Sequence, residues 1–192
     1  MVAPPPPLPP PAAMGKPALR RAARAQRDAF AAHTSTRIAP TGPWAGLMRH
    51  GQTVASYIPL GSEADPTPLV DAARAAGCHI ALPHVTSRAA PMRFLHWADG
   101  APLDAGPFGL RQPPADAPVA TPDIILVPLV AFTRAGVRLG QGAGHYDRAL
   151  STLPHALRVG VALSIQQWAE LPCDPWDMPL HAIITQQEWI AI

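Results

Sequence analysis

The run DIILVPLVAF at residues 123–132 constrains the fold of this chain more than any other segment. Residues 124–127 are all aliphatic, without the polar alternation of a half-exposed strand, which is typical of a strand covered on both faces. Such strands lie in the centre of parallel sheets, because the crossover connections place helices on both faces. The run therefore predicts the central strand of an α/β sheet.

Further strands and helices alternate along the chain around this segment. The helical pattern is expected at residues 16–33, 67–76, 146–150 and 166–170, and the strand pattern at residues 53–58, 79–82, 92–97, 158–163 and 182–185. The segment 92–97 leads into Asp99-Gly100, a turn signal that favours an edge hairpin, and residues 99–122 resemble a long surface loop. We predict one three-layer α/β domain with a mostly parallel central sheet, helices on both faces and a small antiparallel edge element.

Composition excludes several classes of protein. The 192 residues are 48% hydrophobic and 15% charged, which suits a packed core and not wholesale disorder. No apolar run approaches the ~18 residues that cross a bilayer, and the first residues do not resemble a signal peptide. Two cysteines, Cys78 and Cys173, cannot make a disulfide scaffold or, unaided, a four-ligand zinc site, and we expect both to be buried thiols. The sequence predicts a cytoplasmic protein without membrane contact.

The first residues form a separate segment. Residues 1–14 are dominated by proline, which favours an extended polyproline II or disordered leader. We expect the folded domain to occupy residues 15–192 and the removal of residues 1–13 to leave activity unchanged.

The positive charge is concentrated in the first predicted helix. Residues 15–28 carry a local charge of +4 and the rest of the chain −2, since the helix holds one acidic residue against five basic ones: Lys16, Arg20, Arg21, Arg24 and Arg27. Two interpretations stay open from the residues alone, a solvated helix face and a local anion site. Nucleic acid is not an expected partner, because a broad basic face with interleaved aromatic residues is missing.

A glycine-rich turn follows the central strand. Gly140, Gly142 and Gly144 alternate within RLGQGAGHYDR at residues 138–148, so that backbone N–H groups can approach an anion closely. The helix that follows adds its positive end. A tight strand-to-helix turn would explain these glycines equally well.

The charged residues around the turn favour a phosphate site over a simple turn. Arg138 and Arg148 flank it with forked donors that suit phosphate. Asp147 offers a carboxylate of the kind that Mg²⁺ takes together with phosphate oxygens. Two known phosphate motifs do not match: a dinucleotide fingerprint that starts at Gly140 needs a small residue where His145 stands, and a P-loop needs Gly-Lys-Ser/Thr.

Residues 124–150 closely resemble the signature of the 5-formyltetrahydrofolate cyclo-ligase family, also called methenyltetrahydrofolate synthetase. In that family a strand ending Val-Pro-x-x-Ala-Phe precedes Gly-x-Arg-Leu-Gly-x-Gly-x-Gly-Tyr-Tyr-Asp. Weaker similarities follow in the family's order over residues 15–185, at Lys16-Pro-Ala-Leu-Arg20, at Ser56-Tyr-Ile58 up to Glu63, at residues 108–113 and at Asp177.

The resemblance implies a role for each matched residue. Lys16 and Arg20 would contact the phosphates of ATP, with Lys16 and Arg138 acting in catalysis. The nucleotide would also contact a loop made of Arg138, Leu139, Gly140, Gln141, Gly142, Ala143, Gly144, His145 and Tyr146. The folate would be held by Ile58, Glu63, Gln141, Gly142, Ala143, Gly144 and His145. Mg²⁺ would be bound by Asp147 and Asp177.

The activity that the resemblance implies is ATP-driven cyclisation. The substrate would be 5-formyltetrahydrofolate, with or without a polyglutamate tail, and the products 5,10-methenyltetrahydrofolate, ADP and phosphate. We expect a monomer or weak dimer. On this basis Asp147→Asn should remove turnover with little loss of stability.

The chain departs from the family pattern at four histidine or threonine positions. His145 stands where tyrosine is usual, Thr133 and His181 where aspartate is common, and His84 where arginine is usual. None of these removes an expected magnesium ligand. They bear on substrate preference and rate more than on the type of reaction.

Two other functions fit the sequence less well. A non-catalytic relative that binds folate or associates with RNA should have lost several of the matched charged residues, and this chain keeps them. An enzyme acting on a sugar phosphate or an acyl-CoA thioester would be allowed by the fold class alone, but no catalytic carboxylate signature indicates one.

Overall fold

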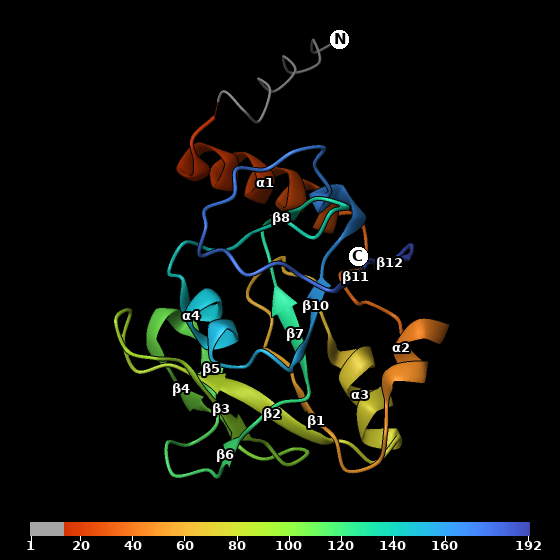
Figure 1. Ribbon diagram of the computed structural model, residues 1–192, viewed down its shortest axis with the longest axis vertical. Helices are drawn as coiled ribbons and strands as arrows, with labels where there is room; N and C mark the ends of the chain where they lie inside the picture. The colour runs from red at the N-terminus through yellow and green to blue at the C-terminus, as the bar shows by residue number, and fades with distance from the viewer. Residues whose placement is uncertain (1–13) are drawn as a thin grey trace.

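The apolar run at residues 123–132 forms strand β7 (Ile124–Pro128) near the centre of an eight-stranded sheet in the computed structural model, which describes residues 14–192 (Figure 1). β7 pairs in parallel with β1 (Thr53–Ala55) on one side and β10 (Leu157–Val161) on the other. The central-strand prediction is therefore confirmed. The leader expected at residues 1–14 lies, except for Met14, outside the described residues.

The sheet is parallel in its middle and antiparallel at its edges. Its order is β12-β11-β10-β7-β1-β2-β3-β6. The parallel part is completed by β2 (His79–His84) and β11 (Ala182–Ile184). Antiparallel strands flank it: β12 (Trp189–Ala191) at one edge, β3 (Arg93–His96) and β6 (Val119–Ala120) at the other.

Four helices and several small elements complete the described part of the chain. The helices are α1 (Lys16–Ala31), α2 (Gly42–Leu47), α3 (Thr67–Ala75) and α4 (His145–Ser151). Two short antiparallel pairs are β4 (Asp104–Ala105) with β5 (Arg111–Gln112), and β8 (Ala131–Phe132) with β9 (Arg138–Leu139). Two 3₁₀ turns occupy Pro107–Gly109 and Ser164–Gln166. No helix among residues 14–192 is long and apolar enough to cross a membrane.

The side chains of β7 show how the sheet is covered. Ile124 and Leu126 belong to the core that contains α3, whereas Ile125 and Val127 belong to the core that contains α4. Successive residues of a strand point to opposite faces, so α3 and α4 cover opposite faces of the sheet, as Figure 1 shows. The predicted three-layer α/β architecture is confirmed.

Several predicted boundaries were wrong. The expected strand at residues 53–58 ends at Ala55, and the expected helix at residues 166–170 is a 3₁₀ turn over Ser164–Gln166. β2 runs through Pro83, whose missing N–H is tolerated because β1 has already ended alongside it. The loop predicted at residues 99–122 contains β4, β5, β6 and a 3₁₀ turn.

Candidate functional site

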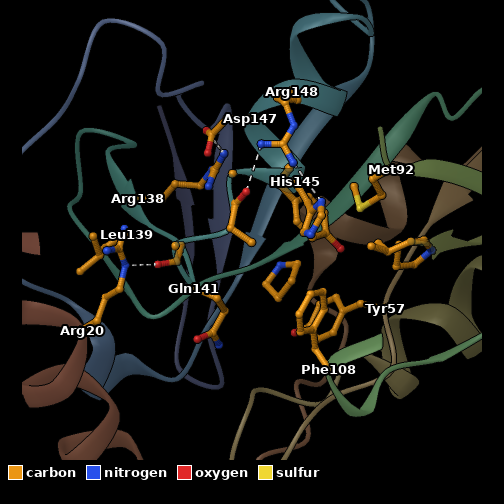
Figure 2. A pocket seen from close by; sticks show the side chains of 18 of the residues that line it. Arg20, Tyr57, Met92, Phe108, Arg138, Leu139, Gln141, His145, Asp147 and Arg148 are labelled. Carbon is orange, nitrogen blue, oxygen red and sulfur yellow. Dashed lines mark hydrogen bonds and ion pairs between the residues drawn. The ribbon is translucent and has the colours of Figure 1, made fainter. Parts of the chain in front are cut away.

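A cleft of about 930 Å³ opens beyond the carboxyl ends of the parallel strands (Figure 2). It is lined by Pro128 at the end of β7, Ile58 after β1 and Pro83 in β2. α1 and the loop 138–146 line it further. Ligands of open α/β sheets bind at this position, because loops from several strands converge there.

The glycine-rich loop packs directly against α1. Gly142 has a φ of +100°, and a Cβ atom there would stand 3.2 Å from Cζ of Arg20. Arg20 Nε donates a hydrogen bond of 2.8 Å to the carbonyl oxygen of Gly140. Only glycine at position 142 combines this backbone conformation with the close approach of the guanidinium group. The loop is thus held against the basic face of the helix.

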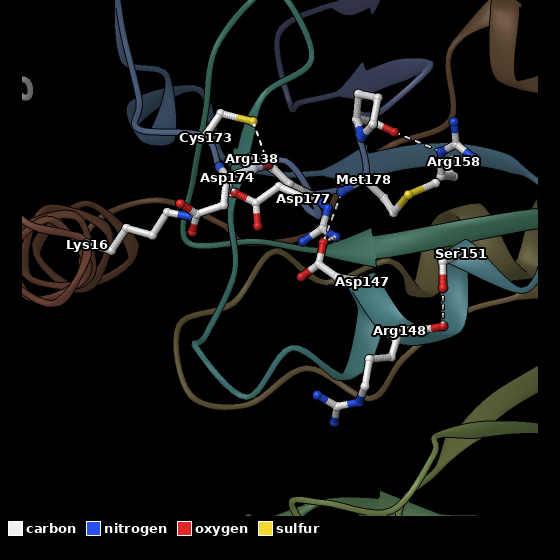
Figure 3. Close-up of polar contacts among 11 residues, drawn as sticks. Lys16, Arg138, Asp147, Arg148, Ser151, Arg158, Cys173, Asp174, Asp177 and Met178 are labelled. Carbon is white, nitrogen blue, oxygen red and sulfur yellow. Dashed lines mark hydrogen bonds and ion pairs between the residues drawn. The ribbon is translucent and has the colours of Figure 1, made fainter.

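Lys16 joins α1 to the segment that follows the 3₁₀ turn at Ser164–Gln166. Its Nζ donates to Oδ2 of Asp174 and to Oδ2 of Asp177, each at 2.6 Å (Figure 3). Burial lowers the pKa of Lys16, but the hydrogen bonds that its Nζ donates to both carboxylates, together with their charges, outweigh burial and raise that pKa above its ordinary value. Burial raises the pKa of Asp177, and the Asp174 N–H and Lys16 together bring it below its ordinary value. Lys16 and Asp177 are therefore both charged at neutral pH.

Arg138 and Asp147 form a second ion pair. Arg138 is buried at the start of β9, and its Nη2 donates to Oδ1 of Asp147, which is 22% exposed on α4. The N–H of Met178 donates to the same oxygen at 3.2 Å. This bond brings the segment of Asp177 next to α4 (Figure 3), and both predicted metal ligands line the cleft.

The two carboxylates fit a magnesium ion that also binds phosphate. Oδ2 of Asp147 and Oδ1 of Asp177 accept no hydrogen bond from residues 14–192, so each has an oxygen available. Those residues contain no group of three histidine, cysteine or acidic side chains that could hold a metal by itself. Mg²⁺ is commonly bound by one or two carboxylates together with phosphate oxygens and water.

The other half of the cleft is apolar. Tyr57, Met92 and Phe108 line it, across from Arg20, Arg138 and Asp147 in Figure 2. Phe108 is 61% exposed and has a φ of +62°, which is strained for an aromatic residue. Burial, followed by the charge of Glu63, raises the pKa of the Tyr57 phenol.

Glu63 lines the cleft and is held by neutral donors. Its carboxylate accepts from the N–H of Leu60 at 3.0 Å and from Nε2 of Gln141 at 2.8 Å. Oε1 of Gln141 accepts from Nη2 of Arg24 at 2.6 Å, which fixes the orientation of the amide. A chain of hydrogen bonds thus runs from α1 through the loop to Glu63.

His145 is oriented by a cation. Its Nδ1 lies 3.1 Å from Nη2 of Arg148, and its ring centroid 6.3 Å from that of Phe108. Burial, followed by the charges of Arg148 and Arg88, lowers the pKa of His145. Because a guanidinium group only donates, Nδ1 accepts and the neutral ring carries its hydrogen on Nε2. The imidazole offers a buried donor where the family pattern has a tyrosine.

The fifteen residues to which the resemblance gives a role all line this one cleft: Lys16, Arg20, Ile58, Glu63, Arg138, Leu139, Gly140, Gln141, Gly142, Ala143, Gly144, His145, Tyr146, Asp147 and Asp177. Their proximity is a property of the structure. Their roles remain predictions.

The resemblance gives no role to several residues that line the cleft, among them Arg24 and Arg27. Lys16, Arg20 and Arg24 are separated by four residues each, and Arg27 follows Arg24 by three. The helical period alone could therefore have placed all four on one face of α1. Nothing in the sequence indicates that Asp174 shares Lys16 with Asp177. Cys173 is exposed, contrary to expectation, because it lies in an irregular segment outside the core, whereas Cys78 is buried as predicted.

Comparison with known proteins identifies similar sequences over most of the chain. The model of the 5-formyltetrahydrofolate cyclo-ligase family matches residues 15–186. The 5-formyltetrahydrofolate cyclo-ligase of Mycolicibacterium smegmatis is 35% identical over 156 residues, which cover 76% of this chain and 79% of that protein. The protein of the same name from Escherichia coli K12 is 34% identical over 154 residues, covering 74% and 83%.

Solved structures agree with the sequence comparison. The NMR structure of Aquifex aeolicus 5,10-methenyltetrahydrofolate synthetase superimposes with a TM-score of 0.68 at 29% identity and covers 93% of each chain. A 5,10-methenyltetrahydrofolate synthetase from Mycoplasma pneumoniae, at 24% identity and the same TM-score, supports the fold and covers 90% of this chain and 99% of that one. The chain therefore belongs to the 5-formyltetrahydrofolate cyclo-ligase family, as its motifs indicated.

Proposed function

We propose that this protein converts 5-formyltetrahydrofolate to 5,10-methenyltetrahydrofolate at the expense of ATP, with Mg²⁺ as cofactor and ADP and phosphate as the other products. One observation carries the proposal: the loop 138–146 borders both a charged half and an apolar half of the same cleft. An anionic nucleotide suits the first half and a pteridine ring the second. The family membership supports the same reaction.

Lys16, Arg20 and Arg138 would hold the phosphates. Each is on the wall of the cleft, and Arg138 has a buried Nε without a partner among the described residues. Phosphoryl transfer depends mainly on positioning and on neutralising charge, which these three cations can do. Lys16 would exchange its two carboxylates for phosphate oxygens when ATP binds.

Asp147 and Asp177 would hold Mg²⁺, each through the oxygen that accepts no hydrogen bond from the described residues. When bound, the ion would neutralise charge on the phosphate oxygens. Arg138, which donates to Oδ1 of Asp147, would keep the carboxylate correctly oriented for this task.

The proposed reaction has two steps. The formyl oxygen attacks the γ-phosphorus and ADP leaves, which gives a phosphorylated imidate-like intermediate. The neighbouring secondary amine then attacks the formyl carbon, its proton passes to water, and phosphate leaves with the original formyl oxygen. Glu63 and His145 would orient the folate for these steps, and the apolar residues Tyr57 and Phe108 would exclude water.

The test follows the methenyl chromophore after purified protein is mixed with 5-formyltetrahydrofolate, ATP and Mg²⁺. We expect a signal that requires both ATP and metal, so that omitting ATP or adding EDTA abolishes it. A folded protein that binds ATP and folate without turnover would instead be a non-catalytic relative. We further propose that the protein acts in the cytoplasm, as a monomer or weak dimer, on substrate with or without a polyglutamate tail.

A further inference from the structure

Trp176 lines the cleft but has no task in the reaction proposed above. It is 70% exposed, more than any other large apolar residue among residues 14–192. No aromatic ring or cation from that part of the chain stacks on its indole. An indole with a free face in a cleft is a surface on which a planar ligand can stack.

The indole is carried by a tight turn with a fixed backbone. The N–H of Asp177 donates to the carbonyl oxygen of Asp174 at 3.0 Å, and the N–H of Asp174 donates back to Oδ2 of Asp177 at 2.8 Å. Pro175 and Trp176 form the tip between them, and the proline ring restricts the backbone there. A ligand that stacks on Trp176 therefore has little backbone freedom to remove.

The turn belongs to the charged half of the cleft. Trp176 directly precedes Asp177, whose carboxylate accepts from Lys16 at 2.6 Å (Figure 3). The next residue, Met178, donates its N–H to Asp147 at 3.2 Å, and Asp147 pairs with Arg138. The indole thus lies beside the groups to which we assign the phosphates and the metal.

The shape of a nucleotide determines which part of it reaches this turn. The γ-phosphate must face the folate, because the formyl oxygen attacks its phosphorus. The base is at the opposite end of the molecule, beyond two more phosphates and the ribose. It must therefore lie past the phosphate-binding cations, on the side away from the apolar half of the cleft.

The cleft has one exposed aromatic residue for each of the two ligands. Among residues 14–192, Phe108 and Trp176 are the exposed aromatic residues that line it. The ring centroid of Phe108 lies 6.3 Å from that of His145, on the side that we assign to the folate. Trp176 is left for the nucleotide.

We propose that Trp176 binds the base of ATP by stacking its indole on the purine ring. The inference rests on the proposed function, because it takes ATP as the nucleotide and places the folate in the apolar half. Stacking strengthens the binding of a base without any role in the chemistry, since the base is remote from the reacting phosphorus.

The test compares ATP with inorganic tripolyphosphate, which has the three phosphates and no base. Calorimetry with Mg²⁺ and without folate gives both dissociation constants. Trp176→Ala should weaken ATP by about 10-fold and leave tripolyphosphate within about twofold. Trp176→Phe keeps an aromatic face and should recover most of the loss. Val119→Ala, at a 64% exposed position on β6 outside the cleft, should change neither.

The methenyl assay supplies a kinetic readout of the same variant. Trp176→Ala should raise the KM for ATP by about 10-fold and leave kcat within about twofold, because stacking on a remote base is the same in the ground state and the transition state.

Three outcomes would overturn the proposal. Trp176→Ala could bind ATP as the wild type does. It could lose ATP and tripolyphosphate equally, which would assign Trp176 to the shape of the turn that carries Asp177. It could weaken 5-formyltetrahydrofolate measured alone, which would assign the indole to the folate. Wild-type turnover that persists in any of these cases leaves the proposed function intact, whereas Trp176-dependent ATP binding without turnover would overturn the proposed function alone.

Discussion

Asp147 has two partners in the folded protein, and both matter for predicting its variants. Its Oδ1 accepts from the buried guanidinium of Arg138 and from the N–H of Met178. From the sequence, Asp147 is expected to act as a metal ligand with little effect on stability. The structure adds a stabilising role, because an uncharged side chain would leave Arg138 with less compensation.

We therefore expect Asp147→Asn to lower turnover by at least about 100-fold and the free energy of unfolding by about 1–2 kcal/mol. ADP release and urea denaturation measure the two effects. Asp116→Asn, at an exposed position in the loop before β6, should change neither. Normal turnover in Asp147→Asn would exclude Asp147 as a magnesium ligand.

His181 is the residue whose departure from the family pattern has a clear structural consequence. Its Nδ1 faces the N–H of Arg158 at 3.1 Å and its Nε2 faces Arg158 Nη2 at 2.7 Å. A neutral imidazole has one acceptor nitrogen, so one of these two donors meets an N–H group. An aspartate, common here in the family, has two acceptor oxygens and a charge that suits the buried Arg158.

We expect His181→Asp to raise the free energy of unfolding by about 1–3 kcal/mol at pH 7.5. Burial, followed by the charge of Arg158, lowers the pKa of His181 below its ordinary value of 6.5. At pH values between the pKa of His181 in the native protein and its pKa in the unfolded chain, the unfolded chain binds more protons than the native protein. The stability that neutral His181 contributes is therefore complete above pH 6.5 and is lost as the pH falls through the native pKa. Urea denaturation at pH 7.5 and pH 5.5 should show a smaller loss for His181→Asp than for the wild type. Equal losses of stability in the two proteins would show that protonation of the His181 ring does not contribute to the pH dependence of stability.

At the scale of elements, α1 and the glycine-rich loop form one unit. The bond from Arg20 to Gly140 and the bonds from Arg24 to Gln141 connect them. The sequence predicts the helix and the loop separately, because helical periodicity and glycine spacing are local signals. Their contact joins residues 120 positions apart, which no local pattern reports.

Gly142→Ala tests that contact. Alanine at a φ of +100° is strained, and its Cβ would displace the Arg20 guanidinium. We expect the KM for ATP to rise about 10-fold and the free energy of unfolding to fall by about 1 kcal/mol, with a smaller change in the KM for folate. Gly46→Ala is the matched control, since a Cβ there meets no atom within 4 Å. A larger change in the KM for folate than for ATP would contradict the assignment of the loop to the nucleotide.

At the scale of the whole molecule, the cleft is assembled from segments distributed along the chain, from α1 at its start to Asp177 near its end. Every residue that we assign to it is Lys16 or later. Removal of residues 1–13 should therefore leave kcat and KM within about twofold, as the methenyl assay would measure. A large loss would assign the leader a role in catalysis or in folding, and circular dichroism would tell the two apart.

The sequence by itself determined the fold class, the central strand and the composition of the glycine-rich loop. Apolar runs, helical periods and glycine spacing depend on neighbouring residues, and they identify β7, α1, α3 and α4. Short elements such as α2 and β12 escaped prediction, because packing stabilises them more than local preference does.

Only the tertiary structure decided which charged groups meet. Lys16 contacts Asp174 and Asp177 across 158 and 161 positions of sequence, and Arg27 reaches Ser62 across 35. Such contacts depend on how the strands and helices cross in space. Whether a charged side chain is buried, and which of its atoms lacks a partner, is set by that packing and has no local signature. That Nη1 of Arg27 is buried without a partner among residues 14–192 is therefore visible in the folded chain and not in the sequence.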